Sequence, residues 1–507
     1  RCSSSLNFLA SSLNFLVSSS FIFRCSIFNL LSSIFFLFSS FLAISFSLSL
    51  IIFSFCAIFL FSSFASCIFC FLIGLKIMSI IVFVRAFNDI DNVLPIVDYL
   101  VRVKAQHVSV YGGREDGYEG ARKQLSYMKD ILKIDVTSFK DRFISRTGKA
   151  ALYLVNRIRE IDDPQNKVLK FFLDLCVVNI VRFLHLIAGL SVKSYVKKLP
   201  KNTIVMADYG TENQFPYKYL LKFCKKRLIP IIAYSHGHSI FVNTDSYHVK
   251  KTILSPKYNK IFQNIFFGRF PKYYYDKYLV GPKQRSTYMS SGNNQGFTEQ
   301  DNVIELGLPR YTREWLEIFI HGYKTESIKN KFQQYNRVKG PNVTFFLSDN
   351  KFNVDENILS DTIDYLVNNK DINFIIKPHT RGMVTRDIPY SKDKSESFYD
   401  KYVCDFDSSE IIEWADIGVV YGTSMSIQML VEGLSIIVPS YIDTNKTIFE
   451  ESDVGNIAKS LNELKYFISS YDKTANPMNN KSTIDFIRQN VYGGKKSYTE
   501  LMDDYCY

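Results

Sequence analysis

Several residue types are scarce in this sequence of 507 residues. It has nine cysteines, and five of them fall within the first 77 residues; the other four are Cys176, Cys224, Cys404 and Cys506. Cysteines so few and so widely spaced exclude a disulfide framework and a zinc site, and they fit a reducing compartment. With 23 Gly, 14 Pro and no sustained heptad after residue 77, the chain is neither collagen-like nor a coiled coil.

Several motifs with a known chemistry are also missing. The sequence has no GxxxxGK[ST] phosphate-binding loop and no HExxH zinc motif. Asp405 and Asp407 resemble a metal-binding DxD pair, but Asp407 followed three residues later by Glu410 is better explained as a helix start with a variant capping box. The basic aromatic tract over 257–285 accompanies no nucleic-acid-binding motif. We therefore expect neither a bound metal, nor another cofactor, nor a nucleic-acid partner.

The first 77 residues differ in composition from the rest. They contain 20 Ser and 17 Phe, only three charged residues, and no Asp, Glu, Pro, Tyr, Trp, His or Thr. Residues 41–75 are apolar enough for one or two membrane spans, whereas a signal peptide would be shorter and more compact. The complementary DNA strand of a Lys- and Glu-rich gene would also encode a segment of this composition. Such a segment would include a seven-residue repeat like that of Ser4–Ala10 as Ser11–Val17. With a plausible start at Met78, this favours mistranslated upstream DNA over a membrane anchor.

Residues 78–507 alternate between short apolar runs and amphipathic stretches. The apolar runs are too short and too rich in β-branched residues for buried helices, so we predict strands. They cover 79–87, 107–111, 204–208, 229–234, 278–280, 303–306, 343–347, 372–376, 417–421 and 436–439. Helices are predicted over 90–106, 217–227, 356–368, 410–415 and 423–432. This alternation predicts an α/β fold with parallel sheets that are covered on both faces.

A polar tract over 286–302, rich in Ser, Asn, Gly and Gln, has the composition of a linker. It separates two sets of strands and helices, so we predict two Rossmann-like domains, over 78–285 and 303–507, that face a cleft. The apolar stretch over 168–190 contains Asp174, Arg182 and His185. Because such charges are costly in lipid, we expect a buried or interfacial helix rather than a membrane span.

Ligands of open parallel sheets bind beyond the carboxyl ends of the strands, so the residues that follow each strand are the first candidates. Lys377, His379 and Arg381 follow the predicted strand 372–376 and can each carry positive charge, which suits a phosphate or pyrophosphate. The alternative is an ordinary basic loop that contains a turn proline.

The glycine turn Gly422-Thr423-Ser424 lies between the predicted strand 417–421 and a helix. Its N–H and O–H donors could bind an anion or cap the helix, and the two uses are compatible. Arg310 stands in a tight turn shortly after the linker and is a further candidate anion ligand.

In the first half, His236 follows the predicted strand 229–234. Imidazole titrates near working pH, so His236 could be a base or a hydrogen-bond donor, or else a structural histidine. Asp208 ends another predicted strand and has Glu212 close behind it. Either carboxylate could serve as a general base or cap the helix near Pro216.

The motifs of the second half resemble those of a known family. Gly307–Arg310, Lys377–His379, Ala415–Ser424 and Gly433–Val438 are similar, in order and spacing, to motifs of GT-B-type enzymes of bacterial surface polysaccharide synthesis. CDP-glycerol glycerophosphotransferases, surface carbohydrate biosynthesis proteins and capsule transferases with a Lys-x-His-Pro motif are the nearest in pattern.

The resemblance implies a donor domain over 303–507 and an acceptor-side domain over 78–285. The implied ligands of the donor phosphates are Lys377, Arg381, Gly422, Thr423, Ser424 and Arg310, and the implied catalytic residues are His236, His379 and, as a weaker candidate base, Asp208. The acidic residue that commonly holds the ribose falls on Gln428, with Glu432 four residues later. The chain departs from the family at Thr380, where Pro is usual, and at Ser435, where Gly-x-Pro is usual.

We therefore predict a metal-independent glycosyltransferase or glycerophosphotransferase that builds a capsule or lipo-oligosaccharide. Its expected partners are a nucleotide-sugar or CDP-polyol donor and a glycan or glycolipid acceptor, and its expected place is the cytoplasm, at the inner face of the membrane with possible peripheral contact. The alternatives are a nucleotide-sugar epimerase of the same two-domain form and a non-catalytic subunit of a polysaccharide assembly complex.

Overall fold

The computed structural model describes residues 78–85, 87–112, 122–159, 184–209, 212, 216–235, 237–238, 240–242, 273–286, 297, 300–323, 332–347, 354–378, 395–420 and 422–506. The predictions for residues 1–77, His236, His379 and Arg381, and for 168–183 of the apolar stretch, lie outside this part of the chain. Within the described residues, none of the helices has both the length and the apolar character needed to cross a membrane.

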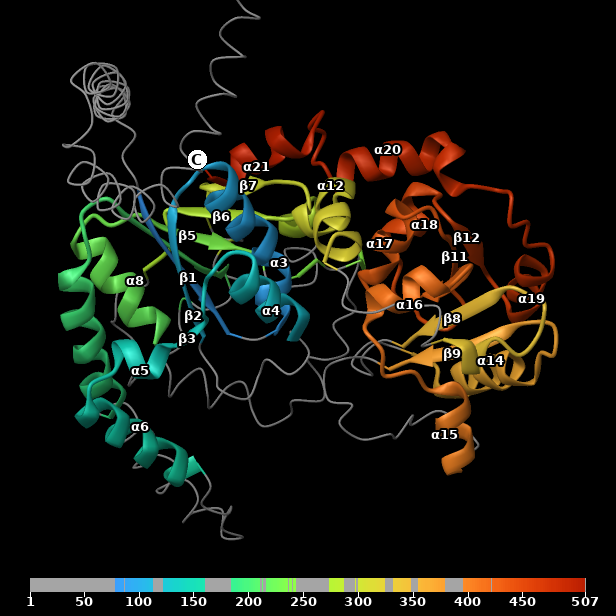
Figure 1. Ribbon diagram of the computed structural model, residues 1–507, viewed down its shortest axis with the longest axis horizontal. Coiled ribbons are helices and arrows are strands. Elements are labelled where there is room, and N and C mark those ends of the chain that lie inside the picture. The colour runs from blue at the N-terminus through green and yellow to red at the C-terminus, as the bar shows by residue number, and fades with distance from the viewer. Residues whose placement is uncertain are drawn as a thin grey trace, which may run out of the picture.

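Seven parallel strands form the sheet of the first half, in the order β3-β2-β1-β4-β5-β6-β7 (Figure 1). They are β1 (Ser79–Val84), β2 (His107–Gly112), β3 (Thr137–Ser138), β4 (Thr203–Asp208), β5 (Ile231–Tyr234), β6 (Lys277–Val280) and β7 (Val303–Glu305). Side chains alternate along each strand, as they must in a pleated sheet. In β1, Ile80 and Val82 face one hydrophobic cluster, while Ile81 and Phe83 face another.

Helices cover both faces of this first sheet. The helices α3 (Phe87–Asp98) and α4 (Arg122–Asp130) lie on one face. The helices α5 (Phe139–Phe143) and α8 (Tyr217–Lys226) and the helix over 184–198 pack on the other, while α6 (Arg146–Arg159) extends from that side (Figure 1). Burial on both faces explains why the strands read as nearly continuous apolar runs rather than as alternating ones.

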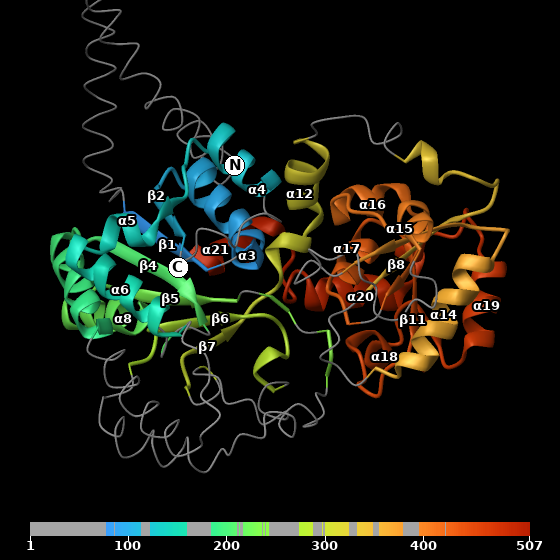
Figure 2. The same ribbon diagram turned by 90° about the horizontal axis from the view of Figure 1, so that it is seen from below.

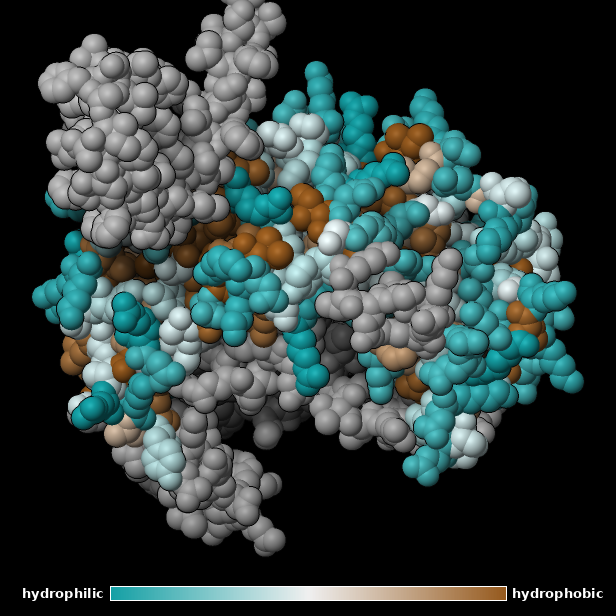
Figure 3. Space-filling model, in the orientation of Figure 1, coloured by the Kyte–Doolittle hydropathy of each residue, from teal (hydrophilic) through white to brown (hydrophobic). Residues whose placement is uncertain are grey.

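Five parallel strands form the second sheet, in the order β12-β11-β10-β8-β9. They are β8 (Asn342–Phe346), β9 (Asn373–Lys377), β10 (Ile417–Val420), β11 (Ser435–Pro439) and β12 (Asn456–Ala458). On one face lie α14 (Glu356–Asn368) and α19 (Leu461–Ser469), and on the other α16 (Ser408–Trp414), α17 (Met425–Val431) and α20 (Lys481–Asn490) (Figure 2). Hydrophilic side chains dominate the outer surface of this half, as expected for helices that shield a sheet (Figure 3).

The remaining helices are short. They include the 3-10 helix η5 (Pro309–Tyr311), α12 (Arg313–Leu316), α15 (Glu396–Tyr402), α18 (Ile448–Ser452) and the last helix, α21 (Tyr498–Cys506). A short π-helix (Tyr99–Val103) follows α3 directly, and a second π-helix covers Glu317–His321. The structure thus confirms the predicted α/β architecture with two parallel sheets.

The division between the two halves differs from the predicted one. Val303–Glu305 pairs in parallel with β6, so it is the seventh strand of the first sheet and does not begin the second half. The tract 286–302 therefore connects two strands of one sheet, and the second sheet begins at Asn342. Composition cannot tell a connection between two strands of one sheet from a linker between domains.

The end of the chain also crosses the predicted division. The helix α21 follows α20 yet lies against α3 and η5 of the first half (Figure 1). Tyr99 donates a hydrogen bond to Asp503 at 2.7 Å, and the Tyr505 hydroxyl donates to the Gly307 carbonyl at 2.8 Å. One hydrophobic cluster accordingly runs from Ile80 of β1 to Met502 of α21.

Candidate functional site

The strand order of the second sheet defines where a ligand would bind. From β8 the chain passes through α14, on one face, to β9, and then returns through α16, on the other face, to β10. The strands β8 and β10 are neighbours, and the connections that leave them lie on opposite faces, with α14 after β8 and α17 after β10. Such a topological switch point leaves a crevice outside the carboxyl ends of the two strands.

The predicted glycine turn lies at this switch point, directly after β10. Gly422 has a φ of +64°, a left-handed conformation that an L side chain rarely adopts. Ser424 occupies the N-cap position of α17 without a capping bond from its side chain, whereas the Thr423 hydroxyl accepts a hydrogen bond from the Met425 amide at 3.3 Å. The predicted side-chain cap of α17 is thus provided by Thr423 and not by Ser424.

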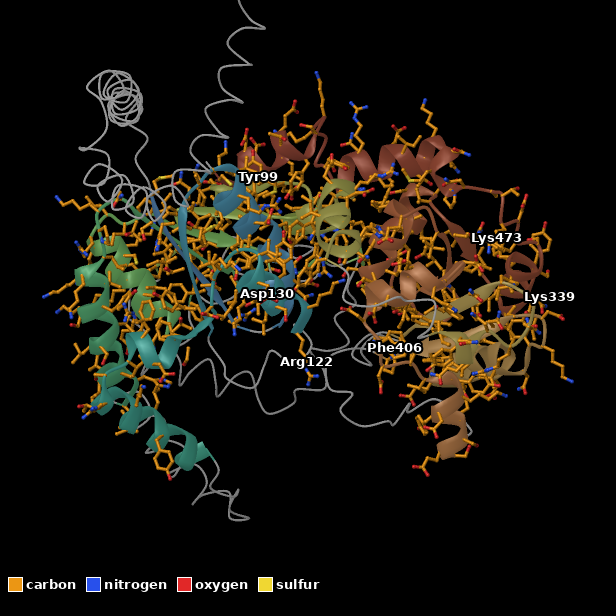
Figure 4. The ribbon with its side chains drawn as sticks, viewed as in Figure 1. Tyr99, Arg122, Asp130, Lys339, Phe406 and Lys473 are labelled. Atoms are coloured by element: carbon orange, nitrogen blue, oxygen red, sulfur yellow. The ribbon has the colours of Figure 1, made fainter. Side chains whose placement is uncertain are left out.

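Lys377 is the last residue of β9, the strand next to β8. Its side chain is buried, and its ammonium donates a hydrogen bond to the Phe406 carbonyl at 2.6 Å. Burial lowers the pKa of Lys377, although Asp407 and Glu410 are close enough to oppose that shift. Figure 4 shows Phe406 on the side of the second half that is nearest the first half. The predicted phosphate ligand therefore lies at the expected edge, with its charge directed to the 404–407 segment.

The predicted helix start after the pair of aspartates is confirmed, because α16 begins at Ser408, but the predicted capping box is wrong. Asp407 stands at the N-cap of that helix, but its side chain makes no capping hydrogen bond. Burial in the surrounding protein raises the pKa of Asp407, and Lys123 of α4, in the first half, opposes this shift. In the ranges that the structure describes, no group of three or more His, Cys, Asp or Glu residues is arranged to hold a metal ion.

Arg310 connects the two halves at the same place. Its guanidinium forms an ion pair with Asp91 of α3, and Nη2 lies 3.9 Å from the sulfur of Met425 in α17. Burial by itself would lower the pKa of Arg310, but the Asp91 carboxylate outweighs this, and the pKa is raised. Segments after β1, β7 and β10 thus meet at one side chain, so the carboxyl ends of the two sheets face each other.

The two candidate ribose ligands contact each other along α17. The Gln428 amide donates to the Glu432 carboxylate at 2.6 Å, and His321 lies 3.8 Å from the other carboxylate oxygen. Burial raises the pKa of Glu432, while Gln428 and His321 lower it. Both side chains face the interior side of the helix, so a ribose would have to displace the contact between them.

The first sheet has its own switch point, between β1 and β4, and an ion pair lies there. Arg85, directly after β1, lies 2.5 Å from the Asp208 carboxylate at the end of β4, and it also contacts Asp89. The Asp208 side chain is fully buried. The sequence proposed Asp208 as a weaker candidate base; the structure gives its carboxylate a cationic partner instead of an open position.

Two residues at this edge of the first sheet received little weight from the sequence. Glu212 is buried, and among the residues that the structure describes one of its carboxylate oxygens has no hydrogen-bond partner. Burial raises the pKa of Glu212 to about 7, and a hydrogen bond from Tyr278 opposes the shift. His238, two residues after His236, has two solvent-inaccessible ring nitrogens. The signal in the sequence was their position a few residues beyond a strand end.

The order of the strands and the two facing edges define a two-lobed α/β protein with a topological switch point in each sheet. No protein-family model matches the sequence, and no curated protein does. Solved structures with an overall likeness include the wall teichoic acid polymerase TagF with CDPG, which is 13% identical over 84% of this chain and 88% of that chain, with a TM-score of 0.42.

Two further similar structures are enzymes of other kinds. The UDP-GlcNAc 2-epimerase from Neisseria meningitidis bound to UDP-GlcNAc is 12% identical over 81% of this chain and 99% of that one, with a TM-score of 0.45. Arabidopsis thaliana UGT89C1 complexed with UDP is 9% identical over 85% of this chain and 100% of that chain, with a TM-score of 0.42. Likenesses this distant leave the activity of the chain to be inferred from its own residues.

Proposed function

We propose that this protein is a GT-B-like transferase that uses a nucleotide-activated sugar or polyol phosphate to build a bacterial surface polysaccharide. The donor nucleotide would bind at the switch point of the second sheet, between the ends of β8 and β10. The acceptor would approach from the first half. A cytoplasmic place at the inner face of the membrane fits an activated donor of this kind and remains part of the proposal.

The observation that carries the proposal is the difference between the two switch points. In the first sheet, Arg85 and Asp208, at the ends of the two central strands, form an ion pair with each other. In the second sheet, the left-handed turn at Gly422 leads into hydroxyl residues, and the Ser424 side chain makes no capping bond. A glycine turn that leads through hydroxyl residues into a helix start, at the end of a strand, suits the phosphates of a nucleotide.

The chemistry would depend on fixed donors that stabilise the charge of the leaving nucleotide. Lys377 and Arg310 lie at the facing edges, and both are held by protein partners in the absence of donor. A phosphate would compete with the Phe406 carbonyl and with Asp91 for these cations. Fixed positive groups in a partly desolvated position contribute strongly to transition-state stabilisation. His236 or His379 would complete the site as the candidate base or phosphate ligand.

The test is a binding screen with CDP-glycerol and with CMP-, UDP- and GDP-linked sugars. A true donor at 100 times its Kd stabilises the folded state by about 2.7 kcal/mol and so raises the melting temperature measurably. We expect Thr423→Val and His379→Ala each to weaken donor binding at least about tenfold, or 1.4 kcal/mol. Nucleotide release, followed by chromatography, should fall in parallel.

Thr474→Val serves as the matched control, because Thr474 is an exposed residue in a turn that bonds only to Asp472. It should bind donor like the wild type. If none of the donors binds, or if Thr423→Val and His379→Ala bind equally well, the proposed donor site is wrong. Conversion of a nucleotide-sugar into its epimer with no acceptor present would identify the epimerase alternative instead.

A further inference from the structure

The second half carries a groove between two helices on its outer side. The helices α14 and α19 cover the same face of the second sheet, at the end of the molecule away from the first half (Figure 2). Between them, residues that the structure describes line a groove with a volume of about 960 Å³. This volume lies at the upper end of the range for sites that bind small molecules. The proposed transferase reaction makes no use of this groove.

The groove lies at the opposite edge of the second sheet from the proposed donor site. Pro341 and Ile372, which line it, directly precede β8 and β9 and so mark the amino ends of these strands. Each strand has five residues, so roughly 15 Å of sheet separates the groove from the carboxyl ends. Lys339 and Lys473 stand two residues from Pro341 and Tyr471 of the lining, and Figure 4 shows both on the side away from the first half. A ligand here would occupy a second site.

Tyrosines from both helices line the groove, and one of them is held in place. The Tyr365 hydroxyl accepts a hydrogen bond from the Asn369 amide at 3.0 Å, and the Lys465 ammonium lies 5.0 Å from the centre of the Tyr365 ring. The Asn369 side chain also accepts from the Asp371 amide at 3.0 Å, which orders the turn before β9. Tyr466, in contrast, is 65% exposed. An exposed ring beside an ordered turn offers a large contact surface at little entropic cost.

The polar lining of the groove mixes hydrogen-bond acceptors with donors. Three carboxylates and two ammonium groups line it, from Asp361, Asp364, Asp371, Lys370 and Lys465. The hydroxyl groups of a sugar can donate to carboxylates and accept from ammonium groups. The C–H face of a sugar ring can also pack on the negative face of an aromatic ring. The excess of carboxylates disfavours a phosphorylated ligand, and a cationic ligand would have to compete with Lys465 for the Tyr365 ring.

We propose that this groove binds an uncharged saccharide chain. A sugar ring would stack on Tyr466, while neighbouring hydroxyl groups would bond to Asp371 and Lys370. The volume of the groove exceeds what one sugar ring needs, so an oligosaccharide fits it better than a monosaccharide. The site only holds its ligand, and no bond is made or broken there. The inference goes beyond the proposed function and does not depend on it, because the lining alone selects the ligand.

The experiment titrates the full chain with maltotetraose, cellotetraose and chitotetraose and follows binding by saturation-transfer NMR. We expect at least one of them to bind with a Kd of about 1 mM or tighter, and Tyr466→Ala to weaken this binding by about tenfold. Asp371→Asn should weaken it by about threefold, because an amide oxygen accepts more weakly than a carboxylate. Both positions are exposed, so both variants should melt within about 2 °C of the wild type.

Matched controls remove the same groups elsewhere. Tyr153→Ala removes a tyrosine of α6 that is 62% exposed, and Asp485→Asn changes an exposed carboxylate of α20. Both variants should bind the saccharide like the wild type. Thr423→Val should do so as well, because it alters the opposite edge of the sheet.

The other outcomes would overturn the inference. They are that none of the three saccharides binds at ten times the expected Kd, or that Tyr466→Ala and Asp371→Asn both bind like the wild type. Binding of inorganic polyphosphate that Tyr466→Ala weakens would assign the groove to an anion instead. Loss of saccharide binding in Thr423→Val would place the saccharide in the donor site. Failure of every nucleotide donor to bind would refute the proposed function and leave this inference standing.

Discussion

Arg310 illustrates what a single residue gains from its tertiary surroundings. Its place in a tight turn marked it as a candidate anion ligand, and it does lie between the facing edges of the two sheets. The sequence could not predict its ion pair with Asp91, because that residue lies more than two hundred positions away. A pair of this kind depends on which strand ends meet, and local composition does not determine that.

Glu212 leads to a prediction about pH at the same scale. Its pKa is raised from 4.5 to about 7 in the folded protein, so between these values the folded state binds more protons than the unfolded state. Stability should therefore fall as the pH rises from about 4.5 to about 7, with a contribution of up to roughly 3 kcal/mol. Glu212→Gln should remove this dependence and be more stable than the wild type at pH 8. Urea denaturation at pH 5 and pH 8 measures both effects.

Glu317→Gln is the matched control, because Glu317 is mostly exposed and its ion pair with Arg313, at 3.9 Å, is long and exposed. It should leave the difference between pH 5 and pH 8 unchanged. An unchanged pH dependence in Glu212→Gln would show that the carboxyl is not protonated in the folded protein at neutral pH.

At the scale of helices and strands, hydrophobic pattern was a reliable guide where the elements were long. The helix over 356–368 begins and ends as predicted, because Asp355 caps it and an apolar face repeats along it. The short strands β3 and β12 were missed. Two or three residues at a sheet edge bury too little surface to leave a periodic signal, and their neighbours in the sheet decide their conformation.

Two aspartates at helix starts allow a direct comparison. Asp355 accepts hydrogen bonds from the Asn357 and Ile358 amides at 3.0 and 3.1 Å. Asp355→Ala should therefore cost about 1 kcal/mol of unfolding free energy. Asp407 makes no capping bond, and its pKa is raised by burial, so Asp407→Ala should cost less than about 0.5 kcal/mol or be stabilising. Urea denaturation of both variants checks the difference; equal losses would contradict it.

At the scale of the whole molecule, the last helix links the two halves. Leu501 and Met502 of α21 are fully buried against the first half, although α20, just before, packs on the second sheet. We expect Leu501→Ala to cost about 2–5 kcal/mol, a large loss for a residue so near the end of the sequence. Hydrogen exchange should show weaker protection of β1 and α3 in particular.

The control for this prediction is Tyr466→Ala, at a residue of the second half whose side chain is 65% exposed. It should change exchange in β1 very little. If Leu501→Ala instead weakened protection only in the second sheet, α21 would not stabilise the first half.

The sequence by itself determined the parallel α/β character and most strand positions, because burial on both faces of a sheet leaves continuous apolar runs in any chain that folds this way. It also marked the Gly422 turn, since only glycine adopts that backbone angle readily. The tertiary structure alone decided that Val303–Glu305 joins the first sheet, that α21 returns to it, and that Arg85 pairs with Asp208 at one switch point. Each of these depends on contacts between segments distant in sequence, and such contacts are set by the packing of the whole molecule.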